Sequence, residues 1–163
     1  MKVAVIGCGT IANAAHIPSY MNNPEAEIKY FCDIIPERAQ AAVEKYGCGT
    51  AVVDYHDVLA DPEVEAVSVC TPNNVHPTIS IDALRAGKNV LCEKAFTVNA
   101  AQARELQELA QARGLFLMEG MWTKCQPVFR TIHQWAKDGV LGEIQAVSCN
   151  FFTKTGAGHR LYK

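Results

Sequence analysis

Near the amino terminus, an apolar run leads straight into a glycine-containing turn. Val3 to Ile6 form the run, and Gly7-Cys8-Gly9-Thr10-Ile11-Ala12 follow it directly. An uninterrupted apolar run of this kind is typical of a central strand in a parallel sheet that is covered on both faces. A helical pattern then continues to Met21. The sequence therefore predicts a strand, a tight turn and a helix in immediate succession, and no other segment narrows the choice of fold so far.

The glycines of this turn suit a phosphate-containing ligand. Gly7 permits the tight turn, and Gly9 lets the backbone approach a ligand because no Cβ stands in the way. A helix that begins near Thr10 and Ile11 offers unpaired N–H groups and the positive end of its dipole to a pyrophosphate. Ala12 replaces the third glycine of a dinucleotide-binding fingerprint and still allows close helix–strand packing. The alternative is that the two glycines only shape the turn.

Strand and helix patterns alternate through about residue 120. Further strands are predicted at 27–33, 51–53, 64–70, 89–92 and 115–118. Helices are predicted between them at 36–46, 54–59, 77–86 and 99–114. Strands joined by helical crossovers form a parallel sheet with helices on both faces. We expect an α/β fold with a doubly wound Rossmann sheet in the order 3-2-1-4-5-6.

An acidic residue ends the second predicted strand. Asp33 lies 21 residues after Ala12, close to the offset of roughly 20 expected for a carboxylate that accepts hydrogen bonds from the adenosine ribose. A carboxylate at this point repels a 2′-phosphate, so Asp33 favours NAD over NADP. Arg38 is close to Asp33 in sequence, and an arginine near this point favours NADP instead. The preference for NAD is therefore not decided by Asp33 alone. The alternative reading of Asp33 is a residue that initiates the helix beginning at Pro36.

Composition excludes several classes of protein. The net charge of −2 gives no basic surface for nucleic acid, and no apolar run approaches the roughly 18 residues of a membrane span. The seven cysteines are odd in number and lack CxxC spacing, so we expect no metal site. We interpret them as reduced, structural thiols of a cytoplasmic protein.

The pattern changes after residue 120. Val128, Ile132 and Trp135 mark one face of an amphipathic helix, and residues 144–152 resemble a long strand. We therefore expect a nucleotide-binding domain at 1–120. Residues 121–163 are interpreted as a linker helix and the first strand of an incomplete second α+β domain.

Four segments together resemble the glucose-fructose oxidoreductase / inositol 2-dehydrogenase (Gfo/Idh/MocA) family. They are Gly7–Ala12, Cys70-Thr71-Pro72-Asn73-Asn74-Val75-His76, Glu93-Lys94-Ala95 and Met118-Glu119-Gly120-Met121-Trp122-Thr123-Lys124. The second and third are more specific than the glycine turn. The fourth is similar to the dihydrodiol dehydrogenase branch. The resemblance implies an NAD(P)-dependent dehydrogenase that transfers hydride between nicotinamide and the hydroxyl of a sugar, polyol or diol.

The resemblance also implies where the cofactor binds. Thr71, Pro72, Asn74 and His76 would line it near the ribose and nicotinamide, at the carboxyl ends of the strands. Trp122 would cover the nicotinamide side. The alternatives are a residue at the start of a helix for His76 and core packing for Trp122.

Lys94 is the residue that the resemblance assigns to catalysis. Oxidation of an alcohol requires removal of its hydroxyl proton as hydride leaves the carbon. A lysine does this if burial and the positive nicotinamide ring favour its neutral amine. Glu93 would orient Lys94 or contact the cofactor. Without the resemblance, Glu93 and Lys94 would be interpreted as a surface pair. Ala95 replaces the proline usual in the family, which loosens the loop but keeps the amine.

Family members are about twice this long, so the substrate side is expected to be incomplete. The predicted strand at 144–152 has an apolar face, and an unpaired edge strand invites pairing between chains. We therefore expect a homo-oligomer, aggregation through this strand, or disorder of it. The alternatives to a dehydrogenase are a non-catalytic NAD(P)-binding module, an inactive dehydrogenase fragment, or a scaffold that uses NAD without net redox change.

Overall fold

The structure is a computed structural model that describes residues 1–150. The chain divides into two compact units, Met1–Met121 and Trp122–Lys163. Each unit is described by itself.

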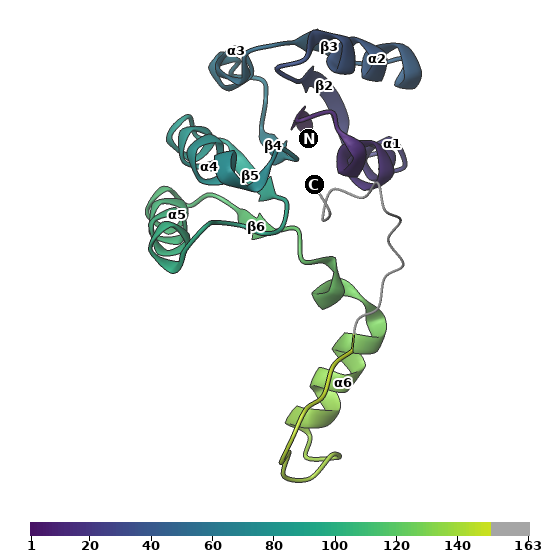
Figure 1. The fold of residues 1–163 in the computed structure, drawn as a ribbon, viewed down its shortest axis with the longest axis vertical. Helices are drawn as coiled ribbons and strands as arrows, with labels where there is room; N and C mark the ends of the chain where they lie inside the picture. The colour runs from purple at the N-terminus through teal and green to yellow at the C-terminus, as the bar shows by residue number, and fades with distance from the viewer. Residues whose placement is uncertain (151–163) are drawn as a thin grey trace, which may run out of the picture. The chain divides into compact units, whose positions relative to one another are not determined.

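Six parallel strands form the sheet of the first unit (Figure 1). They are β1 (Lys2–Ile6), β2 (Glu27–Cys32), β3 (Thr50–Val52), β4 (Ala66–Val69), β5 (Asn89–Cys92) and β6 (Leu117–Glu119). Their spatial order is β3-β2-β1-β4-β5-β6. In the register of the central strands, Val3 pairs with Ile28 of β2 and with Ala66 of β4. The predicted doubly wound sheet and its strand order are confirmed.

Helices connect the strands, with capping residues at several ends. The first helix has a π-type segment, Ala12–His16, followed by α1 (Ile17–Met21). The others are α2 (Pro36–Tyr46), α3 (Tyr55–Ala60), α4 (His76–Arg85) and α5 (Ala100–Arg113). Asp54 caps α3 by accepting the amide of His56, and Asn99 caps α5 by accepting the amide of Gln102. Gly114 ends α5 in the left-handed conformation.

Alternate residues of β1 pack on opposite faces of the sheet. Val3 and Val5 face the first helix and α2, in a cluster that includes the fully buried Phe31. Ala4 and Ile6 belong to the opposite cluster, to which α3, α4 and α5 contribute. Burial of each large apolar side chain in these layers stabilises the fold by about 1.5–3 kcal/mol.

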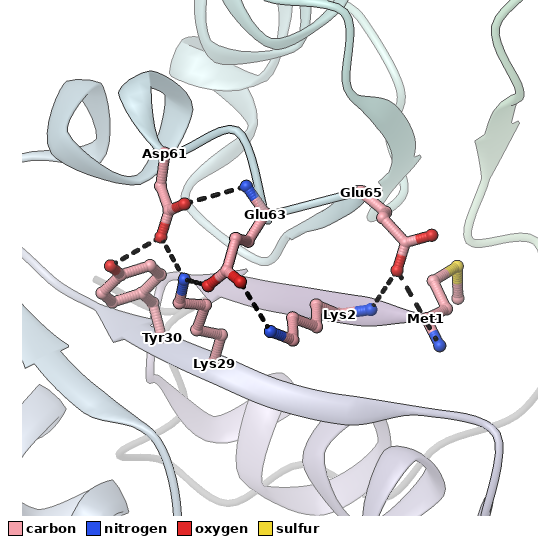
Figure 2. Close-up of polar contacts among 7 residues, drawn as sticks. All are labelled: Met1, Lys2, Lys29, Tyr30, Asp61, Glu63 and Glu65. Carbon is pink, nitrogen blue, oxygen red and sulfur yellow. Dashed lines mark hydrogen bonds and ion pairs between the residues drawn. The ribbon is translucent and has the colours of Figure 1, made fainter.

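A polar network lies where β1 and β2 begin, at the edge opposite their carboxyl ends (Figure 2). Lys29 Nζ lies 2.6 Å from Asp61 Oδ2 and also pairs with Glu63. Tyr30 donates its hydroxyl to Asp61 at 2.8 Å, and Lys2 pairs with Glu63 at 3.0 Å. The pKa of Asp61 is lowered to about 2, first by the hydrogen bond from Lys29 and then by those from the Glu63 amide and the Tyr30 hydroxyl. The network joins the loop before β4 to the two strands.

The second unit contains a short 3-10 turn, Trp122–Cys125, and α6 (Pro127–Lys137). The predicted amphipathic helix is therefore confirmed. The predicted strand at 144–152 is wrong for residues 144–150, which have no regular secondary structure. Residues 151–152 lie outside the described part of the chain. A strand requires a neighbouring backbone for its hydrogen bonds, and an alternating apolar pattern does not supply one.

Candidate functional site

Several predicted site residues follow neighbouring strands at their carboxyl ends. Gly7 follows β1, Asp33 follows β2, Thr71 follows β4 and Glu93 follows β5. Because these strands are parallel neighbours, the loops after them lie along one edge of the sheet. The order of strands reverses between β1 and β4, which is where ligands bind in open α/β sheets.

Gly7 turns the chain against the end of β4. Its φ is +95°, and its amide donates to Cys32 O at 2.7 Å. A Cβ at Gly7 would lie 2.8 Å from the carbonyl carbon and oxygen of Cys70. Both the backbone conformation and the close approach therefore require glycine.

Gly9 faces open space instead. A Cβ built on Gly9 meets no heavy atom within 4 Å. Thr10 and Ile11, at the start of the helix, are both exposed, and the first N–H groups of any helix have no partner within it. The turn therefore leaves open space beside Gly9, next to the exposed start of the helix.

Asn13 holds this turn from within the helix. Its Nδ2 donates to Cys8 O at 2.9 Å and to Gly9 O at 3.1 Å. Its Oδ1 accepts from Tyr46 OH at 3.2 Å. The two loop carbonyls are thereby occupied by an internal donor. Asn13 was not predicted from the sequence, although an Asn in the first turn of a helix is a recognisable signal for hydrogen bonding to nearby backbone.

Asp33 is 7% exposed and is fixed by two backbone amides. Oδ2 accepts from Cys8 N at 2.8 Å, and Oδ1 accepts from Ile35 N at 2.9 Å. Each carboxylate oxygen retains a further lone pair, so ribose hydroxyls remain possible partners. Arg38 lies in α2, the helix that follows.

The turn after β4 combines exposed and buried residues. Pro72 and Asn74 are exposed, whereas His76 is 0% exposed. His76 Nδ1 lies 2.9 Å from Ala95 O, and Nε2 lies 2.8 Å from Thr71 O. His76 therefore joins this turn to the Lys94–Ala95 segment and offers no free ring nitrogen to a ligand here. The hydroxyl of Thr71 is buried without a hydrogen-bond partner in the described residues.

Glu93 and Lys94 differ sharply in exposure. Glu93 is buried, and its Oε1 contacts His16 Nε2 at 2.9 Å. Lys94 is exposed, and within residues 1–150 its ammonium has no hydrogen-bond or ion-pair partner. The peptide bond between Lys94 and Ala95 is cis.

Trp122 is 72% exposed and belongs to the second unit. Its predicted role beside the nicotinamide stays a prediction.

The buried thiols are unsuited to nucleophilic chemistry. Burial, followed by nearby charge, raises the pKa of Cys8 and Cys32 to about 12. Burial also raises the pKa of Cys92 to about 12 and that of Cys70 in the same direction. These thiols stay protonated at neutral pH. The described residues contain no group of three or more His, Cys, Asp or Glu side chains that could hold a metal ion, and none of their helices is long and apolar enough to cross a bilayer.

A tight glycine turn, an open helix start and a carboxylate after β2 define a dinucleotide-binding Rossmann domain. The open space at Gly9 and the unpartnered hydroxyl of Thr71 both fit a bound ligand. The chain belongs to the GFO_IDH_MocA oxidoreductase family with an NAD-binding Rossmann fold, whose family model matches residues 1–121. The predicted family is confirmed.

Individual relatives are dehydrogenases and reductases. The chain is 50% identical over 90 residues to D-xylose 1-dehydrogenase (NADP(+)) from Hypocrea jecorina, covering 55% of this chain and 23% of that protein. It is 37% identical to trans-1,2-dihydrobenzene-1,2-diol dehydrogenase from Oryctolagus cuniculus, covering 70% of this chain and 35% of that protein. A 3-ketoreductase from Actinomadura kijaniata, solved with NADP and TDP-benzene, superimposes with a TM-score of 0.81 at 36% identity, covering 89% of this chain and 44% of that one. The chain thus spans less than half the length of these relatives.

Proposed function

We propose that this chain is the cofactor-binding part of an NAD(P)-dependent oxidoreductase that acts on a hydroxyl of a sugar, polyol or diol. The observation that carries the proposal is the open turn at Gly9, where a Cβ would meet nothing within 4 Å, on the sheet edge that also carries Lys94. Relatives that oxidise or reduce sugars and diols support the substrate class.

The residues of this chain have separate tasks in the proposed reaction. The amides at Thr10 and Ile11 bind the diphosphate, and Asp33 accepts hydrogen bonds from the adenosine ribose. When bound, the nicotinamide cofactor supplies the hydride acceptor or donor. Lys94 Nζ takes the hydroxyl proton during oxidation and returns it during reduction. The buried Glu93 and His76 fix the backbone on either side of Lys94.

Asp33 makes NAD the preferred cofactor in this proposal. Its carboxylate is held in place by the amides of Cys8 and Ile35, so it cannot turn away from a 2′-phosphate without breaking both bonds. The D-xylose dehydrogenase relative uses NADP. A preference for NADP in calorimetric titrations of the chain with each cofactor would therefore contradict the assignment to Asp33.

Hydride transfer tests the catalytic part. The chain is incubated with NAD and a panel of polyols, sugars and diols, and absorbance of the reduced nicotinamide is followed. Lys94→Met is expected to abolish turnover and leave NAD affinity within about threefold, because the lost group acts on substrate. Lys137→Met, an exposed lysine of α6, is the matched control. Equal turnover by Lys94→Met and wild type would reject Lys94 as the acid and base.

The second candidate is a cofactor-binding module without catalysis. The exposure of Lys94 favours it. NAD binding in the calorimeter, with no reduced nicotinamide formed on any substrate of the panel, would support this candidate over the first.

We also propose a cytoplasmic, homo-oligomeric protein. The buried free thiols Cys8, Cys32, Cys70 and Cys92 are typical of a reducing compartment. Exposed apolar side chains of α6, including Phe129, Ile132 and Trp135, support association between chains. Light scattering during size-exclusion chromatography is expected to give a mass above one chain, and a monomer would contradict this.

A further inference from the structure

A buried polar pair joins two segments that are 77 residues apart. His16 Nε2 lies 2.9 Å from Glu93 Oε1. Both residues are 8% exposed. Burying a carboxylate is costly unless it is paired and hydrogen-bonded. The contact with His16 supplies such a partner to the buried carboxylate of Glu93.

His16 lies in the helix whose first turn is proposed to bind the diphosphate. It ends the π-type segment Ala12–His16, in which the amide of Ile17 donates to Ala12 O. Such a turn holds one residue more than an α-helical turn, which changes the side from which His16 leaves the helix. Single π-type turns occur frequently at functional sites.

The other end of the pair reaches the backbone of Lys94. Glu93 Oε2 accepts from Lys94 N at 3.2 Å. The backbone of Glu93 is itself fixed, because its amide donates to Val69 O at 2.9 Å. One carboxylate therefore bridges the first helix and the residue proposed to move the substrate proton.

Gly120 lies against the Glu93 carboxylate, which also contacts His16 and the Lys94 amide. Its amide donates to Cys92 O at 2.7 Å. A Cβ at Gly120 would lie 3.0 Å from Glu93 Oε1, which is tighter than ordinary van der Waals contact. The glycine after β6 leaves the space that the carboxylate occupies.

We propose that His16 is a positioning residue for Lys94, and that it acts through the Glu93 carboxylate. The inference rests on the proposed role of Lys94. The hydrogen bond from His16 holds Glu93 Oε1, the same carboxylate holds the Lys94 amide, and the lysine is thereby set in register with the cofactor-binding helix.

Packing alone does not require this pair. Ala12 and Ile17 already bury the first helix against the sheet, and Tyr20 OH bonds to Ser68 Oγ at 2.6 Å. A buried pair of polar side chains adds little to stability compared with apolar side chains of similar volume. A purely structural role would predict an effect on unfolding that is not specific to Lys94.

The experiment follows the Lys94 amide by ¹⁵N NMR in the full chain. His16→Ala is expected to raise hydrogen exchange of this amide by about tenfold and to move its resonance, because the carboxylate loses its second support. His16→Gln is expected to restore both toward wild type, since its side-chain N–H can donate to Glu93 Oε1. Gly120→Ala is expected to move the same resonance without removing any donor or acceptor.

Tyr20→Phe is the matched control, because it removes a hydrogen bond from the same helix to the sheet without touching Glu93. It is expected to leave the Lys94 amide unchanged. A Lys94 amide that is unaltered in both His16→Ala and Gly120→Ala, or that responds equally to His16→Gln and His16→Ala, would overturn the inference. NAD titration of the wild type is measured alongside, so failure to bind cofactor is recognised separately as failure of the proposed function.

Discussion

The carboxylate of Asp33 accepts a hydrogen bond from the backbone amide of Cys8 at 2.8 Å. Cys8 lies between the two glycines of the turn after β1, and Asp33 is the first residue after β2. One side chain therefore fixes the shape of the proposed diphosphate cradle and stands where the adenosine ribose is expected. A change at Asp33 should affect both.

Replacement of Asp33 is expected to weaken NAD more than NADP. Asp33→Ala removes a charge-assisted hydrogen bond worth about 1.5–3 kcal/mol together with the repulsion of a 2′-phosphate. We expect NAD affinity to fall at least about tenfold and the ratio of NADP to NAD affinity to rise. Calorimetric titration with both cofactors measures this. Glu108→Ala, at an exposed position on α5, should change neither affinity. An unchanged ratio would exclude Asp33 from cofactor choice.

Substitutions of the two glycines in the turn should differ in whether they lower NAD affinity or the free energy of unfolding. Gly9→Ala places a methyl group in open space, so the free energy of unfolding should stay near wild type while NAD affinity falls at least about tenfold, because the methyl fills the cradle. Urea denaturation and calorimetry measure the two quantities.

Gly7→Ala is the companion variant. An alanine at this position would have to adopt a φ of +95° and would place its Cβ 2.8 Å from Cys70. The backbone strain should lower the free energy of unfolding by about 1–3 kcal/mol. A destabilised Gly9→Ala or a fully stable Gly7→Ala would contradict this division of roles.

The sheet could be predicted from the sequence because its signals are local. Central strands such as β1 are short apolar runs, several helices have their own cap or glycine stop, and the handedness of crossovers then restricts the order of strands. Residues 144–150 show the limit of this reasoning. Their alternation is strand-like, but a strand also needs a partner backbone, which no local pattern encodes.

The sequence indicates the residue types of the candidate site, but not the contacts that those residues make. The candidate roles of Gly9 and Asp33 follow from their spacing within one βαβ unit, β1 to β2. The pairing of His16 with Glu93 joins residues far apart in sequence, and no periodicity indicates it. His76 looked available because it follows a loop, but its two ring nitrogens face backbone carbonyls. Burial of a side chain is a tertiary property that the motif alone does not reveal.

Acid should weaken the fold through Asp61. Its pKa is lowered from 3.8 to about 2, first by the hydrogen bond from Lys29 and then by the amide of Glu63. A folded-state pKa below the unfolded value gives stability that is complete above about pH 4 and is lost as the pH falls toward 2. Thermal unfolding between pH 6 and pH 2 measures the loss. Asp61→Asn should be less stable at pH 6 and less sensitive to acid. An identical acid limb in both proteins would refute this role for Asp61.

Asn13 is expected to support cofactor binding without contacting the cofactor. Its Nδ2 donates to the carbonyls of Cys8 and Gly9. Gly9 O also accepts from the Asn13 amide at 3.1 Å, so loss of the side chain takes the hydrogen bond from Cys8 O, beside the proposed site of an anionic diphosphate. Asn13→Ala should lower NAD affinity about fivefold to tenfold, as expected for loss of hydrogen bonds that shape a binding loop.

Asn13→Asp should lower NAD affinity more than Asn13→Ala, because a carboxylate cannot donate to the carbonyls of Cys8 and Gly9 and adds negative charge beside the phosphates. Ser19→Ala removes a side-chain hydrogen bond to Ala15 O in the same helix and should leave NAD affinity unchanged. Titrations at low and high salt separate the two effects, since the extra loss in Asn13→Asp should shrink as salt screens the charge. Equal affinities of Asn13→Ala and wild type would show that the cradle keeps its shape without this side chain.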